Sequence, residues 1–247
     1  CMAWSYGVDF MEKDENGKWK ATFDTPEYAE VFKLISKMRW EDNSLPVTTM
    51  IDYSVPMQMI AANEVGMIFG DYDYVNNIMS TYHMDKDNLG VLRIPSGPKR
   101  NVSLVSGDIY AVDSNATPEQ ISACLDFFEF IGMGPVLNDT VKKNMDETME
   151  RDAQTKMIGP GFRSLWKDDA PSVKYKRELI EKNLNVNAKN VEQGNNLDGL
   201  EFQAEEPVAA QALYTAIDAI IQEVLNNKDA DIEKLISDTA GMFQKNQ

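Results

Sequence analysis

The chain has 247 residues, and 24 Lys and Arg against 40 Asp and Glu give it a formal net charge of −16. Apolar residues make up 43% and charged residues 26%, a composition typical of folded globular proteins that excludes a disordered chain. The acidic balance and the pI of about 4.5 exclude a nucleic-acid partner, because a phosphate backbone attracts basic surfaces.

The inventory of reactive side chains is small. His83 is the one histidine, and Cys1 and Cys124 are the two cysteines. A zinc site needs more of these ligands and a disulfide framework needs more cysteines, although a single bridge stays open. A Ser-His-Asp or Cys-His mechanism would depend on His83, which lies in a polar segment. We therefore predict no catalytic residue, no metal site and no cofactor.

The start of the chain shows no targeting pattern. No basic stretch is followed there by an apolar one, and nowhere do roughly 18–20 apolar residues follow one another as a membrane helix requires. We therefore expect no signal peptide in this sequence. Cys1 is either the lipidated first residue of a mature bacterial lipoprotein or an internal cysteine at a cut end. The aromatic segment that follows favours the cut end, because a lipoprotein normally continues into a polar tether.

The first elements expected are a hairpin and a helix. Residues 4–23 have the pattern of a β-hairpin around the turn pair Asn16-Gly17. A helix follows to about residue 40, with Thr25 as its N-cap and Pro26 at its first position. Its apolar residues recur at helical spacing and predict one buried stripe.

Short elements alternate in the next part of the chain. Weak helical patterns cover residues 52–63 and 74–82, and the apolar run 65–69 between them indicates a buried strand. Further strands are predicted over 89–94 and 102–112, separated by a cluster of Pro and Gly.

The rest of the chain is predominantly helical. Thr117 and Gln120 are spaced for a capping box that opens a helix to about Ile131. A polar connection is expected over 185–206. Further helices are predicted over 138–157, 172–184, 207–227 and 229–243. This order of elements indicates an α/β layer with a helical C-terminal tail.

Several motifs occur in an order that a known family shares. They are Trp4-Ser5-Tyr6-Gly7, Glu15-Asn16-Gly17-Lys18, Phe23-Asp24-Thr25-Pro26-Glu27-Tyr28, the run 59–72, the segments 90–98 and 106–112, the Thr-Pro-Glu helix start at 117, the helix segment 220–225, and Asp229-Ala230-Asp231-Ile232. In this order the sequence resembles the extracellular solute-binding proteins of carbohydrate ABC transporters, the family that includes maltose-binding protein. The resemblance covers essentially the whole chain.

The resemblance implies a fold and a division of the chain. Such proteins have the type II periplasmic-binding fold, with two α/β lobes that hold the ligand in a cleft. This sequence resembles the C-terminal portion, the second lobe plus part of the first. Residues 1–100 would be a second-lobe α/β segment and 101–158 the crossing strand with a first-lobe segment. Residues 159–247 would return to the second lobe as helices.

The resemblance also implies a function. The protein would bind an extracellular sugar or oligosaccharide and deliver it to the permease subunits of an ABC importer, without chemistry. The parent protein would be periplasmic or a lipid-anchored protein of the cell surface. Two other functions stay open, a glycan-processing enzyme domain and an acidic protein-interaction module.

Sugar binding needs flat aromatic rings for the pyranose face and planar polar groups for the hydroxyls. The segment from Gly70 to Tyr74, which includes Asp71, Tyr72 and Tyr74, is the first candidate. Tyr72 stands where the family presents an aromatic residue to the sugar, and Asp71 could accept hydroxyl hydrogen bonds. Alternatively, Tyr72 packs on its own helix and Asp71 is an N-cap. Asp71 and Asp73 could also begin a metal site, which would need more ligands than this motif offers.

Five further residues are candidates by resemblance. Trp4 and Tyr6 match a stretch that often lines the cleft, or they are buried strand aromatics. Asp108 would lie on the cleft floor beside Gly107, which permits a close backbone approach, or it is an ordinary loop carboxylate. Trp166, which follows a Gly-Pro-Gly break, is a further ligand candidate or a packing residue.

Overall fold

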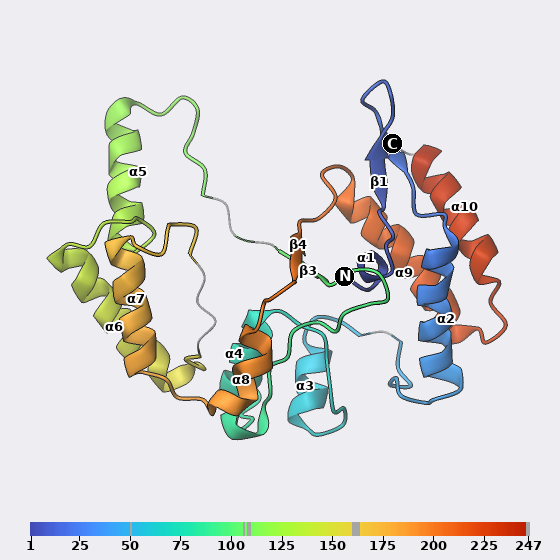
Figure 1. Cartoon of the computed structure of the whole chain (residues 1–247), viewed down its shortest axis with the longest axis horizontal. Coiled ribbons are helices and arrows are strands. Elements are labelled where there is room, and N and C mark those ends of the chain that lie inside the picture. The colour runs from blue at the N-terminus through green and yellow to red at the C-terminus, as the bar shows by residue number, and fades with distance from the viewer. Residues whose placement is uncertain (50, 106, 108–109, 160–163, 246–247) are drawn as a thin grey trace. The chain divides into compact units, whose positions relative to one another are not determined.

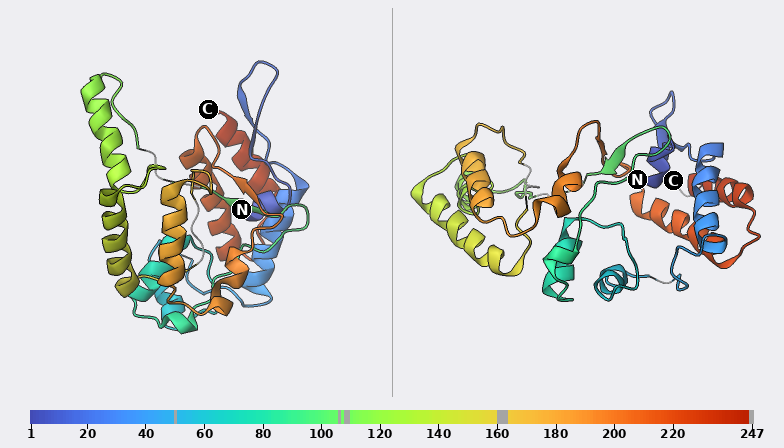
Figure 2. Two further views of the ribbon diagram at one scale, coloured as in Figure 1. Left: turned by 60° about the vertical axis from the view of Figure 1, so that its left-hand side comes forward. Right: turned by 60° about the horizontal axis from the view of Figure 1, so that its bottom comes forward.

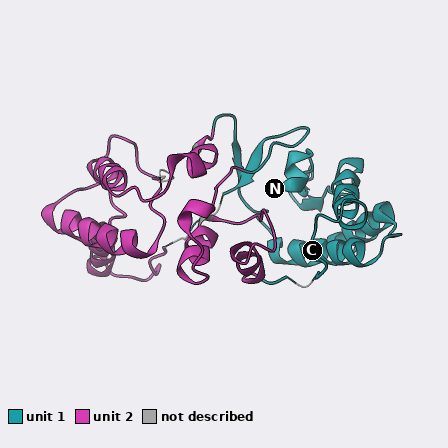
Figure 3. Cartoon of the chain, turned by 90° about the horizontal axis from the view of Figure 1, so that it is seen from below, with its two compact units in different colours: residues 1–52, 94–107, 198–247 teal, residues 53–93, 108–197 magenta. Residues whose placement is uncertain are grey.

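The computed structural model describes residues 1–49, 51–105, 107, 110–159 and 164–245, with Tyr72 and Asn195 described by their backbone alone. These parts of the chain form ten α-helices and four short strands (Figure 1, Figure 2). They divide into two compact units (Figure 3). Unit 1 contains residues 1–52, 94–107 and 198–247, and unit 2 contains 53–93 and 108–197. The chain therefore passes between the units four times.

Unit 1 combines helices with two small sheets. Strands β1 and β2 form an antiparallel hairpin in which Met11 pairs with Ala21, and β3 and β4 pair in parallel, with Val102 opposite Glu201. The bounds are α1 Met2–Ser5, β1 Met11–Lys13, β2 Trp19–Ala21, α2 Pro26–Trp40, β3 Val102–Leu104, β4 Glu201–Gln203, α9 Ala210–Asn226 and α10 Ile232–Lys245.

The core of unit 1 lies where α2, α9 and α10 pack together, as both ribbon views show (Figure 1, Figure 2). Phe10, Phe23 and Tyr28 form an aromatic cluster in which the Phe10 and Tyr28 rings meet at 89°, with centroids 5.6 Å apart. Ile220 and Val224 of α9 are almost fully buried in the same core. These side chains remove apolar area from water, which is the main source of folding stability.

Unit 2 is helical in its described residues and has two separate apolar clusters. One gathers around Met57 and Ile78, and the other around Val141 and Leu179. The bounds are α3 Val55–Ala61, α4 Tyr72–Ser80, the 3-10 helix η1 Lys86–Asn88, α5 Pro118–Phe130, α6 Asp139–Thr155, α7 Pro171–Lys182 and α8 Ala188–Asn195.

The predicted N-caps of α2 and α5 are confirmed. The Tyr28 backbone N–H donates to Thr25 Oγ1 at 3.3 Å, and Pro26 is the first residue of α2. The capping box is complete, since Gln120 N–H donates to Thr117 Oγ1 and Thr117 N–H donates to Gln120 Oε1. Local sequence determines these features, because the partners lie within one helical turn.

The spacing of Ile121, Leu125, Phe128 and Ile131 predicts an apolar face for α5, but this face is not buried. Ile121 is 40% exposed and Leu125 56%, Phe128 and Ile131 are half-buried, and none of the described residues of α5 is buried. The helix therefore forms as predicted, but much of its apolar face is open to water in this chain.

Two predicted strands are wrong. Residues 65–69 form no strand, and Met67 is 83% exposed. Residues 89–94 form none either, and the Val91 N–H donates instead to the carbonyl of Asn190, at 2.6 Å. An apolar run becomes a central strand only if other strands pair with its edges. In the described parts of the chain, strands occur only as the pairs β1–β2 and β3–β4.

Three more segments differ from expectation. The strand predicted over 102–112 is limited, in its described residues, to β3. The predicted hairpin begins later, because Trp4 lies in α1, and the predicted polar connection over 185–206 contains α8 and β4. The α/β fold of the binding-protein family and the division at 1–100, 101–158 and 159–247 stay predictions. None of the described helices is long and apolar enough to cross a membrane.

Candidate functional site

The predicted site at Asp71 lies at the first turn of α4 in unit 2. Asp71 has an extended backbone, and its Oδ1 accepts hydrogen bonds from the backbone N–H groups of Asp73 at 3.0 Å and Tyr74 at 3.2 Å. Its interpretation as an N-cap is therefore confirmed. The Asp71 carboxylate is also exposed, so capping leaves it accessible to a ligand hydroxyl.

Tyr74 meets a second tyrosine that the sequence analysis did not select. The rings of Tyr53 and Tyr74 are edge to face, with centroids 4.7 Å apart and planes at 82°. Tyr53 is 56% exposed, so much of its side chain faces water. No local signal marks Tyr53 as a site residue, because its partner lies beyond α3 in the sequence.

Gly70 makes room for the Tyr74 ring. A Cβ built on Gly70 would lie 2.6 Å from Tyr74 Cδ2, closer than real Cβ contacts allow. The absence of a side chain at Gly70 therefore permits Tyr74 to lie against the backbone that precedes α4.

The electrostatics show that carboxylates lie near both rings. The pKa of Tyr53 is raised by desolvation and by the charges of Asp71 and Asp73. The pKa of Tyr74 is raised by desolvation, then by Tyr53 and Asp71. The tyrosines thus stay neutral at physiological pH and share their surroundings with acceptor groups. An aromatic surface beside carboxylates is the combination that sugar recognition uses.

Two predicted site residues fall partly or wholly outside the described structure. The Tyr72 backbone begins α4, but its side chain lies outside the described residues, as does all of Asp108. Gly107 is described in unit 1, and a Cβ there would meet none of the described residues within 4 Å. Within the described structure, no close contact therefore requires a glycine at Gly107.

Trp4 and Tyr6 belong to unit 1. Trp4 is 5% exposed and packs edge-on against Phe10, with ring centroids 6.5 Å apart. Its interpretation as a buried aromatic is confirmed, although its element is a helix, and it offers no open face to a ligand. Tyr6 is half-buried and packs against the same core.

Trp166 belongs to unit 2 and is 48% exposed. Its Nε1–H donates to the carbonyl of Met133 at 2.5 Å, which fixes one edge of the ring. Of the predicted site residues, the structure thus brings together Asp71 and Tyr74 at the start of α4. Trp4, Tyr6 and Gly107 lie in the other unit.

Cys1 and Cys124 are free thiols, and the Leu104 N–H donates to Cys1 Sγ at 3.2 Å. Across the described ranges, no group of three or more His, Cys, Asp or Glu side chains is arranged to hold a metal ion.

The chain was compared with models of known protein families and with curated proteins, and it matches none of them.

Proposed function

We propose that this protein binds an extracellular solute, a sugar or oligosaccharide, and passes it to the permease of an ABC importer without chemical change. The observation that supports this most is the exposed Tyr53 ring, held edge-on by Tyr74 next to Asp71. Resemblance of the sequence motifs to carbohydrate-binding proteins supports the same function. On the same ground we propose an extracellular or periplasmic location and a lipid anchor on the parent protein.

The chemistry of this patch fits a pyranose. The ring of Tyr53 can pack against the apolar C–H face of a sugar, while the exposed Asp71 carboxylate accepts its hydroxyls. One ring and one or two hydrogen bonds give weak binding, with a Kd on the order of millimolar. Weak affinity is expected from this patch alone.

The test is an NMR titration of the whole chain with glucose, maltose, cellobiose and raffinose. We expect saturable shifts of the backbone amides of Tyr53, Asp73 and Tyr74 with at least one sugar. The absence of any shift at these amides with all four sugars would contradict the proposal. Hydrolysis of an aryl glycoside by the same preparation would contradict it as well and would favour the enzyme alternative.

A further inference from the structure

The segment 65–70 of unit 2 is the apolar run that lies between α3 and α4 along the chain. Among the described residues, none of its backbone N–H or C=O groups has a hydrogen-bond partner. Backbone groups that no protein atom satisfies are hydrated or pair with another chain. The backbone of the segment is therefore available for pairing.

The side chains of this segment alternate between water and core. Met67 is 83% exposed and Phe69 66%, whereas Ile68 between them packs against the apolar cluster around Met57 and Ile78. Alternation with a period of two is the pattern of a strand that has one buried face. Together with its available backbone, this pattern is typical of a strand edge, which is a template for pairing with another chain.

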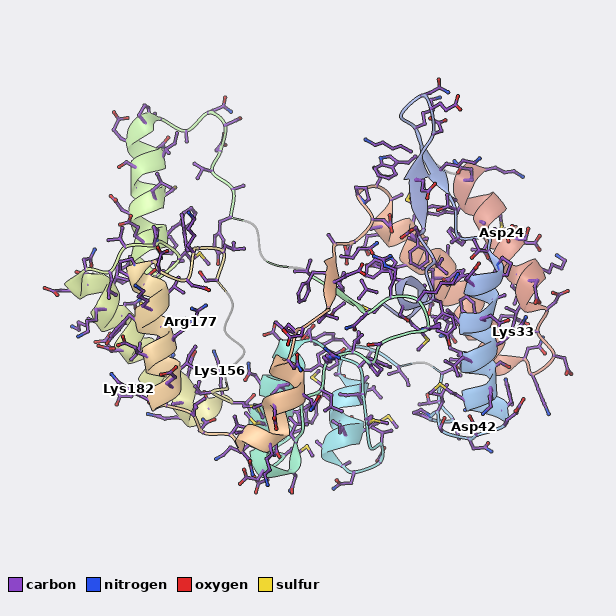
Figure 4. The ribbon with its side chains drawn as sticks, in the orientation of Figure 1. Asp24, Lys33, Asp42, Lys156, Arg177 and Lys182 are labelled. Atoms are coloured by element: carbon purple, nitrogen blue, oxygen red, sulfur yellow. The ribbon has the colours of Figure 1, made fainter. Side chains whose placement is uncertain are left out.

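Acidic side chains flank the segment on both sides. Glu64 precedes it, Asp71 and Asp73 follow it, and all three are exposed. No Lys or Arg occurs from residue 40 to residue 85. Among the described residues, none of the three carboxylates has an ion-pair partner. Figure 4 labels cations of unit 2 that lie just past the end of α6 or on α7, which are Lys156, Arg177 and Lys182. Each end of the segment therefore carries negative charge.

These charges decide which occupant fits. If two copies of the chain paired antiparallel over the full segment, Glu64 of one copy would lie opposite Asp71 of the other. Like charges directly opposite each other destabilise a strand pair. Acidic residues that flank an apolar run also oppose self-association. A strand with Lys or Arg at its ends would instead meet an opposite charge at each end.

We propose that segment 65–70 binds an extended segment of another protein, which adds to it as a β-strand, has alternating apolar side chains and carries Lys or Arg at both ends. Main-chain hydrogen bonds supply the affinity, and the apolar side chains of the partner cover Met67 and Phe69. The basic ends of the partner pair with Glu64 and Asp71. The proposal does not rest on sugar binding, and it shares only Asp71 with the tyrosine patch.

The probe for the test is the peptide acetyl-KTVTVTVK-amide, whose lysines meet the acidic ends in either strand direction. NMR titration of the whole chain should show saturable binding, with a Kd of about 1 mM or below. Alternate backbone amides over 65–70 should also become protected from hydrogen exchange, because every second N–H of a strand points to the same neighbour. Contact through side chains alone would not give this period of two.

Three control peptides separate charge from strand pairing. Acetyl-ETVTVTVE-amide has the same apolar residues and the opposite charge, and it should bind about tenfold more weakly. Two further versions of the lysine peptide are N-methylated, one at its valines and the other at its threonines. Each of them lacks the amide donors of one strand edge. One of the two should lose binding, because the edge that pairs with segment 65–70 then has no donors.

Matched variants assign the contact to the segment. Phe69→Thr removes an exposed ring but keeps a residue that favours strands, so it should weaken peptide binding by about fivefold. Phe127→Thr, at a 54% exposed position of α5, is the control and should leave the affinity within about twofold. Glu64→Lys should weaken binding by about fivefold through charge reversal. Glu150→Lys makes the same change of charge at an exposed position of α6 and should have little effect.

The proposal would be overturned by no binding of the lysine peptide, by equal binding of the lysine and glutamate peptides, or by full binding of both methylated peptides. Equal affinities of Phe69→Thr and Phe127→Thr would overturn it too, and Glu64→Lys against Glu150→Lys decides if a thermal melt shows that Phe69→Thr is unfolded. Protection of the amides over 65–70 that rises with protein concentration, without peptide, would assign the segment to a second copy instead. Sugar-induced shifts at Tyr53 without peptide binding would reject this proposal and leave the sugar proposal intact.

Discussion

Tyr53 and Tyr74 meet edge to face, 4.7 Å between ring centroids, although the whole of α3 lies between them in the sequence. The Asp71 cap fixes where α4 begins, and the Gly70 backbone lets the Tyr74 ring lie close. The contact of Tyr53 therefore depends on two features just before α4, the Asp71 cap and the open space at Gly70, which position the Tyr74 ring.

Gly70→Ala should disrupt the tyrosine pair. The new methyl group would lie 2.6 Å from the Tyr74 ring, so this ring must move. We expect the NMR ring-current shifts of Tyr53 to change and sugar binding to weaken. Gly66→Ala is the control, because a Cβ at Gly66 would meet no described atom within 4 Å. Equal effects of the two substitutions would contradict this role of Gly70.

Variants of Asp71 separate capping from ligand binding. Asp71→Ala removes the N-cap of α4 and should cost about 0.5–2 kcal/mol of stability, measured by urea unfolding. Asp71→Asn keeps a capping oxygen, so it should stay within about 0.5 kcal/mol of the parent protein. If the carboxylate also accepts sugar hydroxyls, both variants should weaken sugar binding. A sugar affinity unchanged in Asp71→Asn would exclude that second role.

Tyr53→Leu should weaken sugar binding by about threefold to tenfold, because it removes an aromatic face but keeps apolar bulk. Tyr110→Leu is a matched control. Tyr110 is also half-exposed, at 52%. Its ring centroid lies 5.4 Å from that of Phe128, and the two ring planes meet at 69°. Calorimetry should show an unchanged sugar affinity for that variant. A loss of affinity in Tyr110→Leu as large as in Tyr53→Leu would show that any aromatic deletion has this effect.

Truncation of a side chain to alanine should lower the stability of the protein in the core of unit 1 but hardly at all on α5. Ile220→Ala deletes a side chain that is 1% exposed and should cost about 2–5 kcal/mol, because it leaves a cavity among α2, α9 and α10. Leu125→Ala, at a 56% exposed position of α5, should change stability by about 0.5 kcal/mol or less. Chemical unfolding followed by circular dichroism measures both. Similar losses would show that the α5 face is covered in solution.

Stability should fall at alkaline pH, partly through Tyr28. Burial raises the pKa of its hydroxyl well above the ordinary tyrosine value of about 10. Above about pH 10 the unfolded chain therefore loses a proton that the folded chain keeps, and stability falls as pH rises. Below about pH 10 this contribution is constant. Tyr28→Phe should flatten the dependence of the urea midpoint on pH. Part of the pH dependence should remain in this variant, because burial and Glu205 raise the pKa of Tyr214 to about 12.

Local chemistry made much of the helical structure predictable. Thr25 with Pro26 and Thr117 with Gln120 open helices where the sequence indicates, since each cap joins residues within one turn. The strand predicted over 65–69 failed because strand formation depends on partners elsewhere in the chain, which no short pattern specifies.

The residues of the candidate site were also predictable only where a short motif marks them. Asp71 and Tyr74 were found because capping and site signals lie together in one short motif. Tyr53 was missed because its partner is distant in sequence.

The exposed apolar side chains of α5 also affect self-association of the protein in solution. The exposed apolar side chains Leu125, Phe127 and Phe130 favour association between copies, while the net charge of −16 keeps copies apart. Salt shortens the reach of that repulsion to about 8 Å at physiological ionic strength but leaves apolar attraction in place. The colloidal state should therefore depend on salt, with dispersed monomers in dilute buffer and growing particles by light scattering as salt is added.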